Sequence, residues 1–182
     1  MRIIGGKYRG KKLISPSSPA VRPTSDKARE ALFNILRSRL GNDFSKLKLL
    51  DVFTGSGAFG LEAISQGFAQ VTMIDIDTSE AAKNAALLPQ EKNKISLIKG
   101  DACKIAQSTD RFDVMFMDAP YNKGLTEKAL ANMSSWLKTG ALCLIEVEKN
   151  EECNLPTDYK LVDERHYGLA KVVIAEYLYQ SL

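Results

Sequence analysis

Apolar residues occur along the chain in short continuous runs that alternate with stretches of helical spacing. A run of roughly four to eight apolar residues predicts a buried strand, whereas apolar residues at helical spacing predict one face of a helix. The predicted strands cover residues 47–53, 70–76, 94–99, 112–117 and 141–147. The predicted helices cover residues 24–40, 61–68, 78–88 and 125–137, with a further short helix after Gly100-Asp101-Ala102.

This alternation of strands and helices is typical of an α/β fold, with a mostly parallel sheet and helices on both of its faces. Residues 160–165 and 171–179 are two β-rich runs that meet near Gly168. They predict an antiparallel C-terminal hairpin at one edge, which makes a seven-stranded sheet. Gly140 is interpreted as the stop signal of the helix before it. Ligands of such sheets bind at the carboxyl ends of the parallel strands.

The first 29 residues are strongly basic. They hold eight Lys and Arg residues and one acid, whereas the whole chain of 182 residues has a net charge of only +3. Residues 1–14 predict a small β-hairpin, with Ile3 and Ile4 on one arm and Leu13 and Ile14 on the other. We therefore expect two parts. A basic hairpin and linker cover residues 1–22, and the main α/β domain covers residues 23–182.

A basic segment beside an acidic body indicates a polyanionic partner that meets one end of the molecule. Cations interleaved with an aromatic residue suit phosphate contacts and base stacking. We expect the segment to reach phosphates that flank a target base, and a solvated basic tail is the alternative. The predicted nucleic-acid-binding residues are Arg2, Lys7, Tyr8, Arg9, Lys11, Lys12 and Arg22.

Composition argues against several classes of protein. No apolar run approaches the roughly 18–20 residues of a membrane span, and the N-terminus lacks the apolar region of a signal peptide. The three cysteines show no C-x-x-C pairing, which argues against a disulfide framework. We expect a cytoplasmic protein without a membrane partner. His166 is the one histidine, so no metal site is expected.

A glycine-rich run, Gly55–Gly60, lies between a predicted strand and a predicted helix. It has the pattern G-x-G-x-x-G, which is informative only in this strand–turn–helix context. Glycines let the backbone turn sharply and approach a ligand closely, and the start of the following helix presents N–H groups to an anionic part of that ligand. The run therefore predicts a cofactor loop, and an ordinary glycine-rich turn is the alternative.

Two acids near this run narrow the choice of cofactor. Asp51 lies on the strand before Gly55, and Asp75 lies at the end of the next strand. A buried carboxylate is costly unless it is paired or hydrogen-bonded, so Asp51 indicates either a positively charged ligand group or donors from the loop. Asp75 can bind two ribose hydroxyls. S-adenosylmethionine satisfies both requirements, whereas NAD satisfies only the second.

The stretch Asp118-Ala119-Pro120-Tyr121 follows the strand predicted over residues 112–117. Methylation of an exocyclic amine requires acceptors for the amine hydrogens, which orient the nitrogen and stabilise its developing positive charge. Asp118 and the carbonyl of Ala119 could be those acceptors, and Tyr121 could stack on an extruded base. An ordinary Asp-x-Pro turn is the alternative.

Two of these stretches are similar to motifs of a known family. DAPY resembles the Asp/Asn-Pro-Pro-Tyr/Phe motif of amino-methyltransferases that act on nucleic-acid bases. RPTSDKAREALFNIL, residues 22–36, resembles the N-terminal signature of the bacterial 16S ribosomal RNA guanine-N2 methyltransferase D family. Together with DVFTGSGAFGLEA, the resemblance covers nearly the whole chain. Ala119 replaces the first proline of the motif, which leaves the rate and the choice of base open.

The resemblance implies a Rossmann-like methyltransferase that uses S-adenosylmethionine and no metal. It would act as a monomer on N2 of one guanine in 16S ribosomal RNA, within an assembled or partly assembled small subunit. Asp51 and the glycine run would surround the methionine end of the cofactor. Asp75 would take its ribose, Asp101 with Ala102 its adenine, and Thr24 would close over it. The implied cofactor-binding residues are Thr24, Asp51, Phe53, Gly55, Gly57, Asp75, Ile76, Asp101, Ala102 and Asp118. The implied catalytic residues are Asp118, Ala119, Pro120 and Tyr121.

Three other functions are weighed against this one. An adenine-N6 methyltransferase on DNA or RNA uses similar acids and aromatics, but the chain has no second target-recognition domain. A noncatalytic RNA-binding assembly factor could share the fold, but Asp51, Asp75 and Asp118 are all intact. A nicotinamide oxidoreductase is disfavoured by Asp51, because a pyrophosphate repels a carboxylate at that position.

Overall fold

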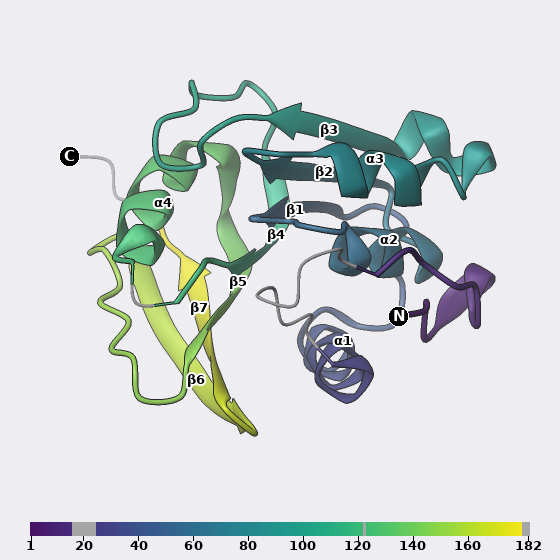
Figure 1. Cartoon of the computed structure of the whole chain (residues 1–182). Coiled ribbons are helices and arrows are strands. Elements are labelled where there is room, and N and C mark those ends of the chain that lie inside the picture. Colours follow the sequence, from purple (N-terminus) through teal and green to yellow (C-terminus); the bar gives the residue numbers. More distant parts are fainter. Residues whose placement is uncertain (16–24, 122, 180–182) are drawn as a thin grey trace.

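A single seven-stranded sheet forms the centre of the molecule (Figure 1). The computed structural model describes residues 1–15, 25–121 and 123–179. The strands are β1 (Lys48–Val52), β2 (Gln70–Asp75), β3 (Ile95–Lys99), β4 (Phe112–Asp118), β5 (Leu137–Glu148), β6 (Tyr159–Tyr167) and β7 (Ala170–Tyr177). Their order in the sheet is β3-β2-β1-β4-β5-β7-β6.

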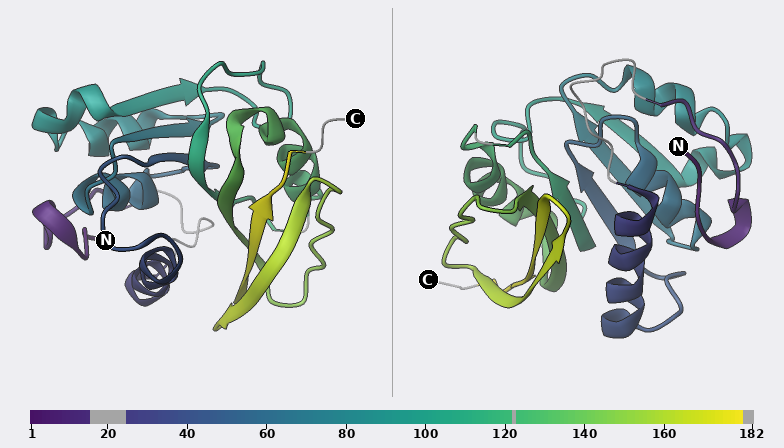
Figure 2. Two further views of the ribbon diagram at one scale, coloured as in Figure 1. Left: turned by 180° about the vertical axis from the view of Figure 1, so that it is seen from behind. Right: turned by 60° about the horizontal axis from the view of Figure 1, so that its bottom comes forward.

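The pairing of the strands confirms the predicted mixed sheet. β1 to β5 are parallel to one another, whereas β7 is antiparallel to both β5 and β6. Figure 2 shows β6 and β7 as a long hairpin at the edge of the sheet opposite β3. The carboxyl ends of the five parallel strands therefore all lie along one side of the sheet, the carboxyl edge. Ligands of parallel sheets bind at this edge.

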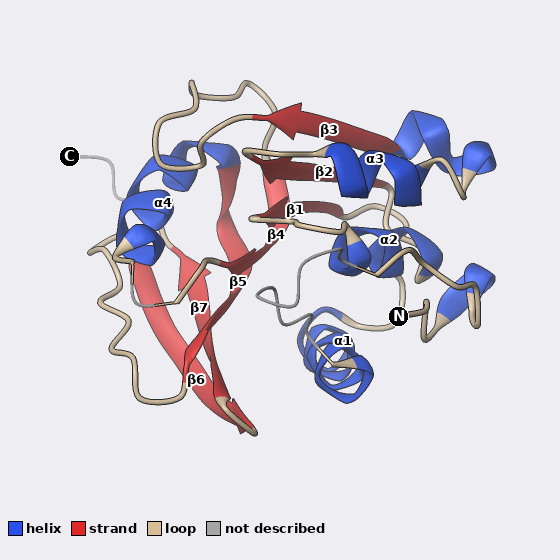
Figure 3. Cartoon of the chain, viewed as in Figure 1, coloured by secondary structure: helices blue, strands red, loops and turns tan. Residues whose placement is uncertain are grey.

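Helices cover both faces of this sheet, as predicted (Figure 3). The α-helices are α1 (Asp26–Leu40), α2 (Ala58–Ser65), α3 (Ser79–Ala85) and α4 (Leu125–Met133), and the short 3-10 helices are η1 (Gly6–Tyr8), η2 (Pro89–Lys94) and η3 (Ser134–Trp136). Successive strand residues point to opposite faces. Leu49 accordingly packs in a core with α1 and α2, whereas Leu50 packs in a second core with α4.

Helix α1 begins where its capping residues predict. The Oγ of Ser25 accepts a hydrogen bond from the Ala28 N–H at 3.2 Å, which satisfies one of the unpaired donors of the first turn. The apolar face of α1 includes Phe33, whose ring lies 5.0 Å from that of Phe59 in α2. Phe59 in turn stacks on Phe116 of β4 at 3.8 Å, so aromatic contacts join both helices to the sheet.

Two predicted features between the strands are wrong. No helix follows Ala102: the chain makes only a single turn there. Asn132 Nδ2 donates to the carbonyls of Ala102 and Ile105 at 2.9 and 3.0 Å, in place of the backbone N–H groups that would bind them in a helix. Gly140 does not end a helix: it lies inside β5 with a φ of 85°. Its positive φ fits the irregular stretch where the pairing of β4 with β5 changes register.

The N-terminal segment is only partly the predicted hairpin. Its two arms are joined by one antiparallel bridge, Arg2–Lys12, and η1 forms the turn between them. The arms are held mainly by the body: Ile3 and Leu13 belong to the core shared with α1 and α2. Gly6 lies so close to α2 that a Cβ would come within 1.8 Å of the Ser65 carbonyl oxygen. The predicted domain boundary at residue 22 lies outside the described residues.

Within the described residues, no helix is both long enough and apolar enough to cross a membrane.

Candidate active site

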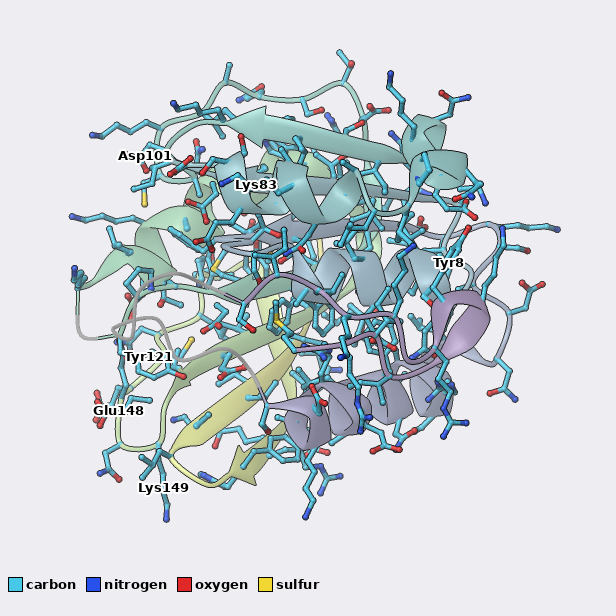
Figure 4. The ribbon with its side chains drawn as sticks, turned by 45° about the vertical axis from the view of Figure 1, so that its right-hand side comes forward. Tyr8, Lys83, Asp101, Tyr121, Glu148 and Lys149 are labelled. Atoms are coloured by element: carbon cyan, nitrogen blue, oxygen red, sulfur yellow. The ribbon has the colours of Figure 1, made fainter. Side chains whose placement is uncertain are left out.

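The predicted functional side chains of the main domain follow adjacent strands. The glycine run follows β1, Asp75 ends β2 and Asp118 ends β4, and β1 lies between β2 and β4. Because these strands are parallel, the three groups lie at the same edge of the sheet. Figure 4 shows Asp101 and Tyr121 on this side of the molecule.

Asp51 holds the glycine run from inside. Its side chain is only 1% exposed, and its Oδ2 accepts hydrogen bonds from Thr54 Oγ1 at 2.5 Å and from the Gly60 N–H at 3.0 Å. Gly57, the N-cap residue of α2, has no side chain to cap the helix, so the Asp51 carboxylate satisfies a first-turn donor instead. Of the two alternatives for Asp51, the structure therefore shows donors from the loop.

Burial raises the pKa of the Asp51 carboxyl to about 7, although the hydrogen bonds from Thr54 and Gly60 lower it. The unfolded-state pKa of an Asp is about 3.9. Between about pH 4 and pH 7, the Asp51 carboxyl therefore binds a proton in the folded protein but not in the unfolded chain. The contribution of this difference to the stability of the fold is complete below about pH 4 and is lost as the pH rises through 7.

We expect Asp51→Asn to remove this component of the pH dependence. Urea unfolding between pH 5 and pH 8 should show the free energy of unfolding of the wild type falling more steeply with pH than that of the variant. The comparison cancels the other titrating groups, because they are common to both proteins. Parallel profiles over this range would show that Asp51 is ionised throughout.

The backbone of the loop is strained in a manner that functional sites often show. Phe53 has a φ of 61°, and no other non-glycine residue in the described ranges has a positive φ. Such a backbone conformation costs of order 1–3 kcal/mol in a bulky residue. Gly55 (φ 53°) has no described atom within 4 Å of the place where a Cβ would stand, so the loop faces open space there.

Asp75 holds the loop from the neighbouring strand. Its Oδ2 accepts from the Gly55 N–H at 2.9 Å and its Oδ1 from the Asp77 N–H at 3.1 Å. It is partly exposed, and the next side chain, Ile76, is 69% exposed. An acid and an apolar surface therefore lie side by side beside the glycine run.

Asp101 and Ala102, the two residues predicted to bind the adenine, differ in how far they are buried. The Asp101 side chain is partly exposed and pairs with Lys104 at 3.3 Å, and the hydrogen bond from the Cys103 N–H holds the pKa of Asp101 below its usual value. Ala102 is 2% exposed, and its carbonyl accepts from Asn132 Nδ2 at 2.9 Å. Asp101 is thus the accessible member of the pair.

The stretch after β4 turns at the same edge. Ala119 is buried, whereas Pro120 and Tyr121 are exposed. The Tyr121 hydroxyl donates to Glu146 Oε1 at 3.1 Å, and Glu146 pairs in register with Asp118 on the adjacent strand. Asp118, Glu146 and Tyr121 therefore lie together near the carboxyl ends of β4 and β5. The sequence analysis missed Glu146, although an acid within the apolar run of β5 was a visible signal.

Asn84 is a second residue that the sequence analysis missed. Its side chain is fully buried, and its Nδ2 donates to the carbonyl of Ser56 in the glycine run at 2.9 Å. The same amide binds Ile14 twice: Nδ2 donates to its carbonyl at 3.1 Å, and Oδ1 accepts from its N–H at 2.7 Å. Asn84 therefore ties the glycine run to the N-terminal segment. A polar residue on an amphipathic helix gives no sign of such a contact.

Lys7 and Tyr8, at the tip of the N-terminal segment, both bind Glu91. The Lys7 Nζ and the Tyr8 hydroxyl each lie 2.7 Å from Oε1 of this buried carboxylate. The hydrogen bond with Glu91 raises the pKa of Lys7 to about 12, and the one with Lys7 lowers the pKa of Glu91 to about 2. The two predicted RNA contacts therefore anchor the segment to η2.

This anchor lies far from the candidate active site. Because η2 directly precedes β3, Glu91 lies at the amino edge of the sheet. Figure 4 accordingly shows Tyr8 and Tyr121 on opposite sides of the molecule. The tip of the segment thus does not lie beside the predicted base site. Arg2, Arg9, Lys11 and Lys12 are exposed, and the predicted residues Arg22 and Thr24 lie outside the described ranges.

The glycine run, Asp75 and Asp118 lie at one edge of the sheet, and comparison with known proteins shows the family. The model of the family described as "Conserved hypothetical protein 95" matches residues 1–176. The chain belongs to that family.

Two curated relatives of the chain carry the name ribosomal RNA small subunit methyltransferase D. The protein from Escherichia coli K12 is 36% identical over 175 residues, which cover 92% of this chain and 85% of the relative. The protein from Haemophilus influenzae is 33% identical over 189 residues, covering 100% of this chain and 94% of the relative. The resemblance expected from RPTSDKAREALFNIL and DAPY is thereby confirmed.

A solved structure shows the same fold. The Escherichia coli protein yhhF, provisionally described as a methyltransferase, superposes with a TM-score of 0.82 at 32% identity and covers 99% of both chains. The predicted Rossmann-like α/β fold of S-adenosylmethionine-dependent methyltransferases is confirmed. Among the described residues, no three His, Cys, Asp or Glu side chains are grouped so that they could hold a metal ion.

Proposed function

We propose that the protein methylates the exocyclic N2 of a guanine in the 16S ribosomal RNA of the small subunit, with S-adenosylmethionine as methyl donor. One observation carries this proposal: Asp118-Ala119-Pro120-Tyr121 ends β4 beside the glycine run of β1. Two curated relatives, 33% and 36% identical to this chain, carry a name that states methylation of small-subunit ribosomal RNA. The wider context, a cytoplasmic monomer acting on an assembled or partly assembled subunit, belongs to the same proposal.

The residues at the edge fit the proposed cofactor. Gly55 opens onto free space where a side chain would stand, so a ligand can approach the loop backbone there. Asp75 is partly exposed at the end of β2 and has the acceptors that ribose hydroxyls require. Exposed Ile76 and Asp101 could contact the base of the cofactor. When bound, the cofactor would supply an electrophilic methyl group.

The chain's own groups would act on the target base. Asp118 and the Ala119 carbonyl are proposed to accept hydrogen bonds from the two hydrogens of the guanine amine. These acceptors would orient the nitrogen and stabilise the positive charge that it gains, and Asp118 could take up the proton released. Tyr121, anchored through its hydroxyl on Glu146, would stack on the base.

We expect Asp75→Ala to weaken binding of S-adenosylhomocysteine by roughly tenfold to a hundredfold. Hydrogen bonds to a charged group contribute about 1.5–3 kcal/mol each, and Asp75 also holds the Gly55 N–H. Isothermal titration measures the effect. Asp77→Ala is the matched control, because this exposed acid lies two residues away and accepts hydrogen bonds from Ser79, not from the glycine run. Equal affinity in the Asp75 variant and the wild type would contradict the cofactor assignment.

Mass mapping of methylated nucleotides tests the reaction itself. Ribosomal RNA from cells with and without this protein should differ at one N2-methylguanine of the small subunit. Loss of an N6-methyladenine instead would favour the adenine enzyme. Identical maps, together with retained RNA binding, would favour a noncatalytic assembly factor.

A further inference from the structure

A groove of about 470 Å³ lies between the N-terminal segment and α1. Residues 3–6 and Gly10 of the N-terminal segment line it on one side, and residues of α1 together with Gln66, which follows α2, line it on the other. Three arginines line it, Arg2 and Arg9 from the N-terminal segment and Arg37 from α1, against one acid, Glu30. We call it the arginine groove. It is separate from the carboxyl edge, where the candidate active site lies.

Buried acids hold the walls of the groove in place. Glu62 of α2 accepts from the N–H groups of Ile4 and Gly5 at 2.7 and 2.8 Å, and this carboxylate is fully buried. Glu91 fixes the tip of the same segment through Lys7 and Tyr8. The backbone beside the arginine groove is therefore held in place by the fold, so binding a ligand there would order mainly the arginine side chains.

The arginines of the groove have donors to offer a ligand. Arg37 is oriented by Asn34 Oδ1 at 2.8 Å and by Gln66 Oε1, but a guanidinium carries five N–H donors. Arg9 is exposed, and its guanidinium makes no hydrogen bond or ion pair with another described residue. Arg2 pairs with Asp26 at 3.4 Å, and its side chain stays 67% exposed. A forked guanidinium matches the oxygens of a phosphate, which it can bind through two parallel hydrogen bonds.

We propose that the arginine groove binds phosphates of the RNA backbone at a distance from the base that is methylated. The inference rests on the proposed function, because the substrate supplies the polyanion. A second contact of this kind would orient a folded RNA on the enzyme without reading its sequence. The groove adds Arg37, which the sequence did not single out, to the predicted contacts Arg2 and Arg9.

Salt titration of RNA binding tests the proposal. The probe is an unmodified 16S ribosomal RNA transcript, and the variants are Arg9→Gln and Arg37→Gln. Each lost phosphate contact should reduce the slope of log affinity against log salt by about 0.7–0.9. Arg37→Lys should keep the slope of the wild type, because the positive charge remains. Circular dichroism and unchanged affinity for S-adenosylhomocysteine confirm that each variant is folded.

Arg39→Gln is the matched control. Arg39 lies on the same helix two residues further on, is exposed and pairs with Asp163 at 3.7 Å, but does not line the groove. For Arg39→Gln, the slope of log RNA affinity against log salt should equal that of the wild type. The proposal is overturned if Arg9→Gln and Arg37→Gln keep the wild-type slope, if Arg39→Gln loses as much as they do, or if Arg37→Lys loses as much as Arg37→Gln.

Two further outcomes separate this inference from the proposed function. If the slope changes occur with whole small subunits and not with the protein-free transcript, the groove meets an acidic ribosomal protein and the phosphate assignment is wrong. The mapping experiment uses the wild type and is independent of these variants. An N2-methylguanine that depends on this protein, with unchanged slopes, would refute the groove alone. Absence of that mark would refute the proposed function.

Discussion

Asp118→Ala is expected to lower the turnover of methylation by about 10²–10³, the loss seen when one preorganised polar group is removed from other active sites. Asp118 ends β4 at the carboxyl edge, in register with Glu146 on β5. The variant removes an acceptor that is proposed to face the guanine amine, so the loss should fall on the chemical step. Single-turnover methylation of small subunits that lack the mark would measure it.

Two comparisons show whether Asp118 acts on the base. Affinity for S-adenosylhomocysteine should change much less than turnover, because the loop around Asp51 and Asp75 stays intact. Asp118→Asn keeps a carbonyl acceptor without the charge, so its turnover should lie between those of the wild type and Asp118→Ala. A near-normal rate in the Ala variant would exclude the role. A loss of cofactor affinity as large as the loss of rate would place Asp118 at the cofactor instead.

The carboxyl-edge site could be predicted because its signals are local in the sequence. The run Gly55–Gly60 directly follows an apolar strand, and Asp75 and Asp118 each end a strand of their own. In a parallel sheet, position at a strand end is enough to bring such groups to one edge. The alternating pattern was also enough to predict a mostly parallel sheet. The order of the strands, β3-β2-β1-β4-β5-β7-β6, was not predicted, because it depends on how strands distant in the sequence pair.

The remaining features depend on contacts between distant segments. Lys7 and Tyr8 lie more than 80 residues from Glu91 in the sequence. The residues around them show cations and an aromatic ring, but not the carboxylate that both of them bind. Asn84 likewise binds Ile14, 70 residues away. Gly140 misled because a glycine serves equally as a helix stop or at an irregularity within a strand, and only strand pairing distinguishes the two.

Glu62→Ala is expected to lower the free energy of unfolding by about 3–5 kcal/mol, the usual effect of removing one partner from a buried ion pair. Arg29 and Glu62 are both buried, with Nε and Oε2 3.7 Å apart. Burial lowers the pKa of Arg29, and the charges of Glu62 and Asp26 oppose that shift. Without Glu62, the guanidinium keeps the Arg2 carbonyl at 2.6 Å as a neutral acceptor, and its one remaining charged partner among the described residues is Asp26, whose side chain is 44% exposed.

Urea unfolding followed by circular dichroism would measure this loss, with Glu30→Ala as the matched control. Glu30 is an exposed acid on α1 beside Arg29, so its removal should change stability by no more than about 0.5 kcal/mol. Glu62→Gln keeps an amide oxygen that can accept from Ile4 or Gly5, and its loss should be intermediate. A change below about 1 kcal/mol for Glu62→Ala would mean that water enters and solvates Arg29.

The same variants connect stability with the arginine groove. Ile4 and Gly5 form part of its wall and depend on Glu62 for their N–H partners. Glu62→Gln should therefore loosen the wall and weaken RNA binding at fixed salt. It removes none of the groove's arginines, so the salt slope should stay within experimental error of the wild type. Arg37→Gln should show the converse, a smaller slope in a protein of nearly unchanged stability.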